Sequence, residues 1–343
     1  MTGRPLGRHL ALAAGAALVL GACSAPGAGT GSSAAPLTRT ETPRSSTPTE
    51  GAASPPGTPS APRRLRVRSA GFRLPTAVGR EAVAGSGCSA VVAGGLVGGD
   101  SSISNAYRVD LHRGRVTQLP PLPVPVHDTA GGTAGRALVI GGGNSSEQSV
   151  VQGWDGNRWK IDGHLPRPRS DLVAATVDGQ VIIAGGYDGT RPAEADILSS
   201  TDGHAWKVTG TLPVPVRYPA STVSDGAIWL FGGEAGGTLQ TAIQRIDPST
   251  GHARVAGRLA VRLGHAVAIA FGTRILIAGG RTGTNSPTDR MWWFDPQTSA
   301  ISRAGRLPHP LADSAVAQCD AAGFILGGET PRMTDEVLRV TYN

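Results

Sequence analysis

Polar side chains that could bind a ligand or transfer a proton recur at similar intervals along residues 100–329. One set precedes short apolar segments: His127, Asp128, Arg169, Asp171, Arg217, Tyr218, Arg262, His265 and Asp313. A second set follows glycine pairs or short apolar segments: Asp100, Asn144, Tyr187, Asp188, Glu234, Arg281 and Glu329. Arginines give bidentate hydrogen bonds to carboxylate or phosphate, and histidine or glutamate can transfer protons. These residues suit a polar or anionic ligand, or are solvated loop residues and arginines that tie neighbouring units together.

Common catalytic and metal-binding motifs are missing from the sequence. It has no glycine-rich phosphate loop that opens a helix, no His-x-x-x-His or Cys-x-x-Cys pair and no Gly-x-Ser-x-Gly motif. Residues 200–206 faintly resemble a sialidase Asp box, but the spacing is wrong and the segment occurs once, which favours a simple hairpin turn. We therefore expect no metal and no cofactor.

Short apolar segments that end in two glycines recur along the chain and would position the polar residues. Clear copies occupy residues 138–142, 181–186, 228–233, 274–280 and 324–328, and a blurred copy ends at Gly98–Gly99. The first glycines lie at 98, 141, 185, 232, 279 and 327, so the intervals are 43, 44, 47, 47 and 48 residues. Such a period indicates a repeat architecture. The hydrophobic fraction of 39% with 49 Gly and 26 Pro suits an all-β fold with many turns.

One repeat, residues 259–308, predicts four strands. A first strand follows Val261–Ala268, a second covers 275–278, a third 291–294 and a fourth 301–307, with tight turns between them. Four short strands per repeat are typical of a propeller blade. Six glycine pairs therefore predict a six-bladed β-propeller of four-stranded blades.

These repeats resemble Kelch repeats. The resemblance rests on the glycine pair, the lead-in Arg262-Leu263-Gly264-His265, the aromatic–Asp ends of third strands (Trp154-Asp155 and Phe294-Asp295), and the tryptophans Trp159 and Trp206. It covers residues 61–343, although the tryptophan is missing from several repeats and the first repeat is irregular between Ala84 and Gly95. The resemblance implies that the polar loops share one face, the usual ligand site. It does not select a function, because Kelch propellers include enzymes and binding modules.

The last repeat has only three strands, and the first strand of the domain would complete it. Residues 65–75 look like the fourth strands of other repeats, so we expect them to pair with the C-terminal strand and remove an exposed sheet edge. Cys88 and Cys319 would then lie in neighbouring blades, where a disulfide could staple the ring. Two buried free thiols are the alternative.

The N-terminal 60 residues read as an export signal and a tether. Residues 1–22 have a basic start and a short apolar run, followed by Leu20-Gly21-Ala22-Cys23, which resembles a bacterial lipobox. We expect Cys23 to be lipidated, with palmitate among the acyl chains; an ordinary signal peptide is the alternative. Residues 23–60 are rich in Ser, Thr, Pro and Gly and predict a disordered tether. The predicted propeller spans residues 61–343.

The charge and the predicted export limit the possible partners. The net charge is +7, but the basic residues are scattered and form no nucleic-acid-binding module. We therefore expect a monomeric, lipid-anchored binding module on the outer face of the bacterial cytoplasmic membrane. Its partner would be an envelope glycan, peptide or protein, met at the loop face, and not nucleic acid. The alternative is a sugar-active enzyme resembling the Kelch sugar-acid mutarotases, in which Glu234 or His265 transfers a proton and Arg217 or Arg262 holds an acidic sugar.

Overall fold

The computed structural model describes residues 64–283 and 286–343. The expected signal peptide (1–22), the lipidation site Cys23 and the tether (23–60) lie outside the described residues. All regular elements of the described chain are β-strands. No helix in this part of the chain is long and apolar enough to cross a membrane.

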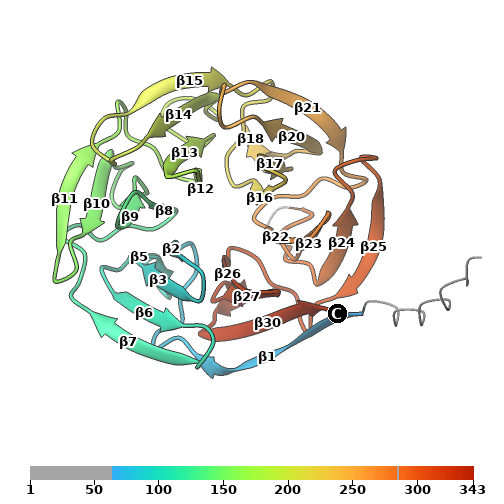
Figure 1. Cartoon of the computed structure of the whole chain (residues 1–343), viewed down its shortest axis with the longest axis horizontal. Coiled ribbons are helices and arrows are strands. Elements are labelled where there is room, and N and C mark those ends of the chain that lie inside the picture. The colour runs from blue at the N-terminus through green and yellow to red at the C-terminus, as the bar shows by residue number, and fades with distance from the viewer. Residues whose placement is uncertain (1–63, 284–285) are drawn as a thin grey trace, which may run out of the picture. The chain divides into compact units, whose positions relative to one another are not determined.

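Six four-stranded antiparallel sheets surround a common axis, as blades of a propeller (Figure 1). Blade 1 contains β2 (Ala82–Ser86), β3 (Ser89–Ala93), β6 (Ala106–Asp110) and β7 (Arg115–Leu119). Blade 2 contains β8 (Ala130–Thr133), β9 (Ala137–Ile140), β10 (Val150–Trp154) and β11 (Trp159–His164). Blade 3 contains β12 (Val173–Val177), β13 (Gln180–Ala184), β14 (Asp196–Ser200) and β15 (Lys207–Thr211).

The second half of the chain repeats this arrangement. Blade 4 contains β16 (Ala220–Ser224), β17 (Ala227–Phe231), β20 (Ala242–Ile246) and β21 (Ala253–Arg258). Blade 5 contains β22 (Val267–Phe271), β23 (Arg274–Ala278), β24 (Arg290–Phe294) and β25 (Ile301–Arg306). Blade 6 contains β26 (Ala315–Cys319), β27 (Ala322–Leu326), β30 (Glu336–Tyr342) and β1 (Leu65–Arg73). The predicted all-β, six-bladed fold is confirmed.

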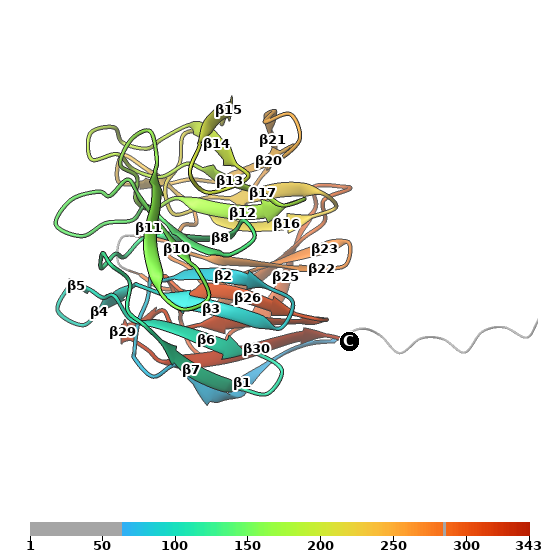
Figure 2. The same cartoon turned by 60° about the vertical axis from the view of Figure 1, so that its left-hand side comes forward.

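Two opposite faces result from the antiparallel order. We call the side that carries the connections from second to third strands, and those into first strands, the loop face. It bears the small hairpins β4 (Leu96–Val97) with β5 (Ser101–Ser102), β18 (Glu234–Ala235) with β19 (Thr238–Leu239), and β28 (Glu329–Thr330) with β29 (Arg332–Met333). The tight turns between first and second, and between third and fourth, strands form the turn face. In Figure 2 the β4–β5 hairpin and β29 lie on the left and the C-terminus on the right.

The N-terminal strand completes blade 6, as predicted. β1 pairs with β30 in antiparallel register from Leu65 opposite Tyr342 to Arg73 opposite Glu336, with one irregularity after Ser69. A disulfide joins Cys88 in blade 1 to Cys319 in blade 6, so the expected staple is present. The ring is thus closed both by strand pairing and by a covalent bond across the next seam.

The glycine pair has a geometric role at every blade junction. The second glycine donates its N–H to a carbonyl of the following blade, as from Gly142 to Arg169, Gly233 to Leu263 and Gly328 to Val78, each at 2.8 Å. The first glycine has positive φ, for example 60° at Gly232, and a Cβ there would lie 2.0 Å from the Leu263 oxygen. No other residue type fits this close approach.

The sixth glycine pair is not the one that the sequence suggested. In blade 1 the pair is Gly94–Gly95, because Gly95 donates its N–H to Val126 of blade 2 in the common pattern. Gly98–Gly99 instead form the turn between β4 and β5, where Gly99 has a φ of 82°. Since 141 − 94 is 47, the first interval is 47 residues and not 43. Both the β4–β5 turn and the junction between blades 1 and 2 require glycine, so the two glycine pairs look alike in the sequence.

We predict that Gly232→Ala destabilises the propeller more than Gly226→Ala. Both glycines have similar φ values, 60° and 66°, so both alanines carry the left-handed strain of roughly 1–2 kcal/mol. Gly226 has no atom within 4 Å of its added Cβ, whereas Gly232 meets the backbone of blade 5. The clash should add about 1–3 kcal/mol, measured by denaturant unfolding. Equal losses in the two variants would contradict a junction role for the glycine pair.

Candidate functional site

Six residues, one from each blade, form a closed circle around the axis on the loop face. We call them the axial ring: Arg80, Asp128, Asp171, Tyr218, His265 and Asp313. Each has a φ between 50° and 61°, which is uncommon outside glycine. The backbone N–H of each ring residue donates to the carbonyl of the ring residue in the preceding blade, at 2.8 to 3.0 Å, and Arg80 donates to Asp313. The six hydrogen bonds therefore return to their starting point.

The positions beside the ring bring the two polar sets of the sequence together. The residue before each ring residue pairs with the residue after its blade's glycine pair, as in Ser170 with Tyr187, Arg217 with Glu234, and Ala312 with Glu329. Side chains from the connection into the first strand therefore stand next to side chains from the loop after the second strand. The expectation that these loops share one face is correct.

His265 lies at the centre of the most extensive charge network. Its Nδ1 is 2.6 Å from an Asp313 oxygen and its Nε2 is 3.7 Å from Glu234. Arg281 donates two hydrogen bonds to the other Asp313 oxygen, at 2.9 and 3.2 Å, and one to Glu329 at 2.6 Å. Two cations thus share the buried carboxylate of Asp313.

The opposite part of the ring is built around Asp128. Tyr218 donates a hydrogen bond to Asp128 across the ring at 3.1 Å, and Arg80 reaches the same oxygen at 3.4 Å. Arg80 Nε is also 3.7 Å from Asp313. The Tyr218 ring stacks on the His265 ring with 4.1 Å between centroids. One arginine and one tyrosine therefore link the two carboxylates around the axis.

Asp171 forms a third charged group with its neighbour from blade 4. Arg217 Nε lies 2.7 Å from an Asp171 oxygen, and its guanidinium lies over the rings of Tyr187 and Tyr218, at 4.6 and 4.8 Å. Burial raises the pKa of Asp171 to about 7, helped by the charge of Asp128 and opposed by Arg217. This carboxyl can therefore change charge near neutral pH.

The ring surrounds the mouth of a cavity on the axis. The mouth has a volume of about 130 Å³ and is lined by all six ring residues. It shares Glu81, Thr129, Ser314 and other residues with a cavity of about 480 Å³ that runs along the first strands. Both Glu81 carboxyl oxygens are buried without a hydrogen-bond partner, and burial raises the pKa of Glu81 to about 8. At neutral pH Glu81 is therefore mostly uncharged.

Nine of the eleven predicted ligand-face residues lie in or beside the ring, and two do not. Asp128, Asp171, Tyr218, His265 and Asp313 are ring members, and Arg217, Glu234, Arg281 and His127 contact them. Arg169 is 3% exposed and hydrogen-bonds the carbonyls of Gly185 and Asp196 in blade 3 through its side chain, while its backbone bonds Gly142 and Gln148 of blade 2, so it ties adjacent blades together. Arg262 is exposed and donates to the Leu239 carbonyl.

Arg80 and Glu81 line the cavity but were missing from the prediction. The signal was available, since Arg80 precedes Asp128 by 48 residues, the same interval that separates His265 from Asp313. The pair Gly98–Gly99 resembles the junction pair Gly94–Gly95, which shifts the apparent alignment of the first repeat by four residues and conceals its ring residue.

A comparison with protein families identifies the repeat. Residues 262–300, most of blade 5, match the family model of the Kelch motif. The chain is a six-bladed β-propeller with a Kelch motif in blade 5. No curated protein matches the chain. The matched residues include His265, so the ring residue of blade 5 lies within the Kelch motif.

We predict that His265 stabilises the Kelch propeller below pH 9 and not above it. Burial opposes its charged form, but hydrogen bonds and charge from Asp313, with help from Glu234, prevail and raise its pKa to about 9. Because this value lies above the ordinary 6.5, the stabilisation is complete below about pH 6.5 and is lost as pH rises through 9. The difference corresponds to about 3 kcal/mol.

The free energy of unfolding of the parent and of His265→Gln should be compared at pH 6 and pH 10. The loss caused by the substitution should be about 3 kcal/mol larger at pH 6. His252→Gln, at an exposed position of the turn face, is the matched control and should show no such difference. A loss that is the same at both pH values would show that the charge of His265 contributes nothing.

Proposed function

We propose that this Kelch propeller is an exported, lipid-anchored binding module whose loop face recognises an envelope glycan or peptide, or a protein that carries one. The propeller fold is consistent with an interaction module. The observation that carries the proposal is the cavity mouth of about 130 Å³ bounded by six polar ring residues. Concave sites with convergent polar groups are the usual places for ligands.

The charge pairing supports an uncharged polar ligand over an anionic one. Arg80, Arg217 and Arg281 each already contact at least one carboxylate of the ring. An anionic ligand would have to separate these pairs, and leaving a buried charge unpaired is costly. Hydroxyl or amide groups can instead add hydrogen bonds without separating them. Among the expected envelope ligands, a neutral glycan or peptide is therefore favoured, and the acidic sugar of the enzyme alternative is not.

The envelope location rests on the N-terminal sequence. The apolar run before Cys23 and the lipobox-like residues 20–23 favour export and lipidation, and residues 23–60 are long enough to separate the propeller from a membrane. The proposed partner is for this reason an envelope component. Lipidation can be tested separately by mass spectrometry of the parent and of Cys23→Ala.

A sugar-active enzyme is the second candidate, favoured by one specific contact. His265, with a pKa of about 9, lies between Asp313 and Glu234 at the edge of the mouth. A protonated imidazole held by two carboxylates can act as a proton donor to a bound sugar. NMR would follow conversion of any sugar that binds, and loss of turnover but not of binding in Glu234→Gln would support the enzyme.

We predict that Arg217→Gln abolishes ligand-induced stabilisation and that Arg262→Gln does not. Both arginines lie on the loop face, but only Arg217 contacts the ring, through Asp171 and Tyr218. The measurement is a thermal-shift screen of the chain from residue 24 onward against neutral and acidic envelope sugars and peptides. A neutral glycan at 100 times its Kd should stabilise the parent by about 2.7 kcal/mol.

Three results would contradict the ligand proposal. Equal effects of the two substitutions would place binding away from the ring. Stabilisation by acidic sugars alone would contradict the preference for an uncharged ligand. No stabilisation by any sugar or peptide would leave a protein surface as the partner and would remove the support for the enzyme.

A further inference from the structure

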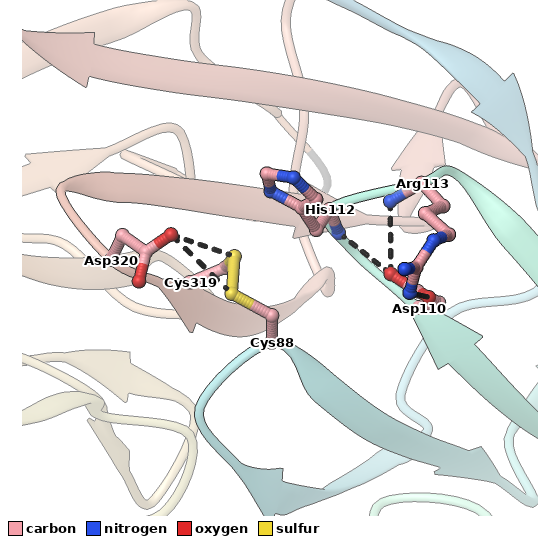
Figure 3. The surroundings of a disulfide bond; sticks show 6 residues. All are labelled: Cys88, Asp110, His112, Arg113, Cys319 and Asp320. Atoms are coloured by element: carbon pink, nitrogen blue, oxygen red, sulfur yellow. Dashed lines mark hydrogen bonds and ion pairs between the residues drawn. A yellow bond between two sulfur atoms is a disulfide. The ribbon is translucent and has the colours of Figure 1, made fainter.

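Two hollows on the turn face lie on either side of blade 1, one at the seam with blade 6 and the other on the face of blade 1 that points toward blade 2. They flank the β6–β7 turn, Leu111–Gly114, which hydrogen-bonds the backbone of Cys88 and lies beside the disulfide (Figure 3). One hollow, of about 450 Å³, is lined by Arg339, Arg113 and Thr341 among others. The other, of about 590 Å³, is lined by Arg108, Arg113 and Arg115. We use the name basic seam for the arginines around these hollows and on the adjoining strands β1 and β30: Arg66, Arg68, Arg108, Arg113, Arg115 and Arg339.

The arginines of the basic seam exceed the acids available to pair with them. Two acids line the hollows: Asp110 hydrogen-bonds the backbone and side chain of Arg113, and Asp320 lies beside the disulfide sulfurs. No carboxylate of the described residues lies within ion-pair distance of five other exposed arginines of the seam: Arg66, Arg68, Arg108, Arg115 and Arg339. Two of them, Arg68 and Arg339, are directly opposite each other in the β1–β30 ladder. Like charges in this position repel, so a bound anion would relieve the repulsion.

The chain also enters the propeller at the basic seam. Arg64 and Asn343 exchange backbone hydrogen bonds on the turn face, where β1 begins and β30 ends. Any anchor upstream of residue 64 is therefore connected to the propeller at this place. The axial ring lies on the opposite, loop face. Across the turn face, blades 3 and 4 carry four acids, Asp178, Asp202, Asp225 and Asp247, beside the three bases Lys207, Arg245 and Arg254.

We infer that the basic seam docks on an anionic phospholipid membrane. In this orientation the axial ring, on the opposite face, points away from the membrane. Phosphate oxygens of lipid headgroups suit guanidinium groups, which form bidentate hydrogen bonds with them. Blades 3 and 4 lack an excess of bases on this face, so the propeller contacts the membrane through blades 6 and 1, next to the point of chain entry. The choice of a membrane as the partner depends on the proposed envelope location. The electrostatic contact itself requires no lipid anchor.

The test uses the chain from residue 24 onward, which lacks the predicted lipidation site and contains every strand of the closed ring. It is sedimented at low salt with vesicles of phosphatidylcholine alone or mixed with phosphatidylglycerol. The seam variant is Arg66→Gln/Arg68→Gln/Arg339→Gln. The matched control is Arg167→Gln/Arg290→Gln/Arg332→Gln, which removes three exposed arginines from the loop-face end of the blades. Thermal unfolding verifies that both variants fold.

We expect binding only to the anionic vesicles, and binding that weakens as salt is added. The seam variant should bind about 100-fold more weakly, from roughly fivefold per arginine, and the control should bind like the parent. Equal losses in both variants would overturn the inference, because net charge alone would then explain binding. Binding to soluble polyphosphate but not to vesicles would overturn the membrane as occupant.

These outcomes are separate from those of the ligand screen. The seam variant keeps the axial ring intact, so it should retain ligand-induced stabilisation. The Arg217→Gln variant keeps the seam intact, so it should retain vesicle binding. Failure of one proposal therefore leaves the other standing.

Discussion

The rest of this propeller depends on backbone hydrogen bonds that cross from blade to blade and close on themselves near the axis. One circle joins the six ring residues, and a second set joins the second glycine of each pair to the following blade. Because these bonds use backbone atoms, the side chains of the ring are free to vary. The same geometry thus holds an arginine, a tyrosine, a histidine and three aspartates at equivalent positions.

Because the ring side chains can vary, this propeller places both acids and bases at equivalent positions around the axis. The backbone circle brings the three aspartates close to the axis, where burial opposes their ionised forms. Arg80, His265 and Arg281 compensate by pairing with Asp128 and Asp313. The compensation is complete only at Asp313, because burial still raises the pKa of Asp128 and raises that of Asp171 to about 7. The polar mouth is consequently a nearly neutral network of pairs and not a field of one sign.

The repeat explains how much of the structure the sequence could predict. The blade number, the strand order and the pairing of β1 with β30 follow from periodic apolar segments and from the incomplete last repeat. The face of the predicted site follows as well, because the connections that carry it occupy equivalent places in each blade. The roles of individual arginines do not, since Arg169 and Arg217 occupy similar positions in sequence but one is buried between blades. The error in blade 1 arose because Gly94–Gly95 and Gly98–Gly99 lie four residues apart and both satisfy the local pattern.

Completion of blade 6 by β1 also governs the order in which the molecule can be assembled. Among the strands of the described residues, β1 is the first to leave the ribosome and β30, its partner, is the last. Such a distant pairing forms slowly, because a long loop must close before any contact is made. During synthesis or export, the apolar residues Leu65 and Val67 stay without their partners in blade 6 until β30 has been made. The polar residues that alternate with them, including Arg66 and Arg68, therefore protect this waiting strand from pairing with another chain.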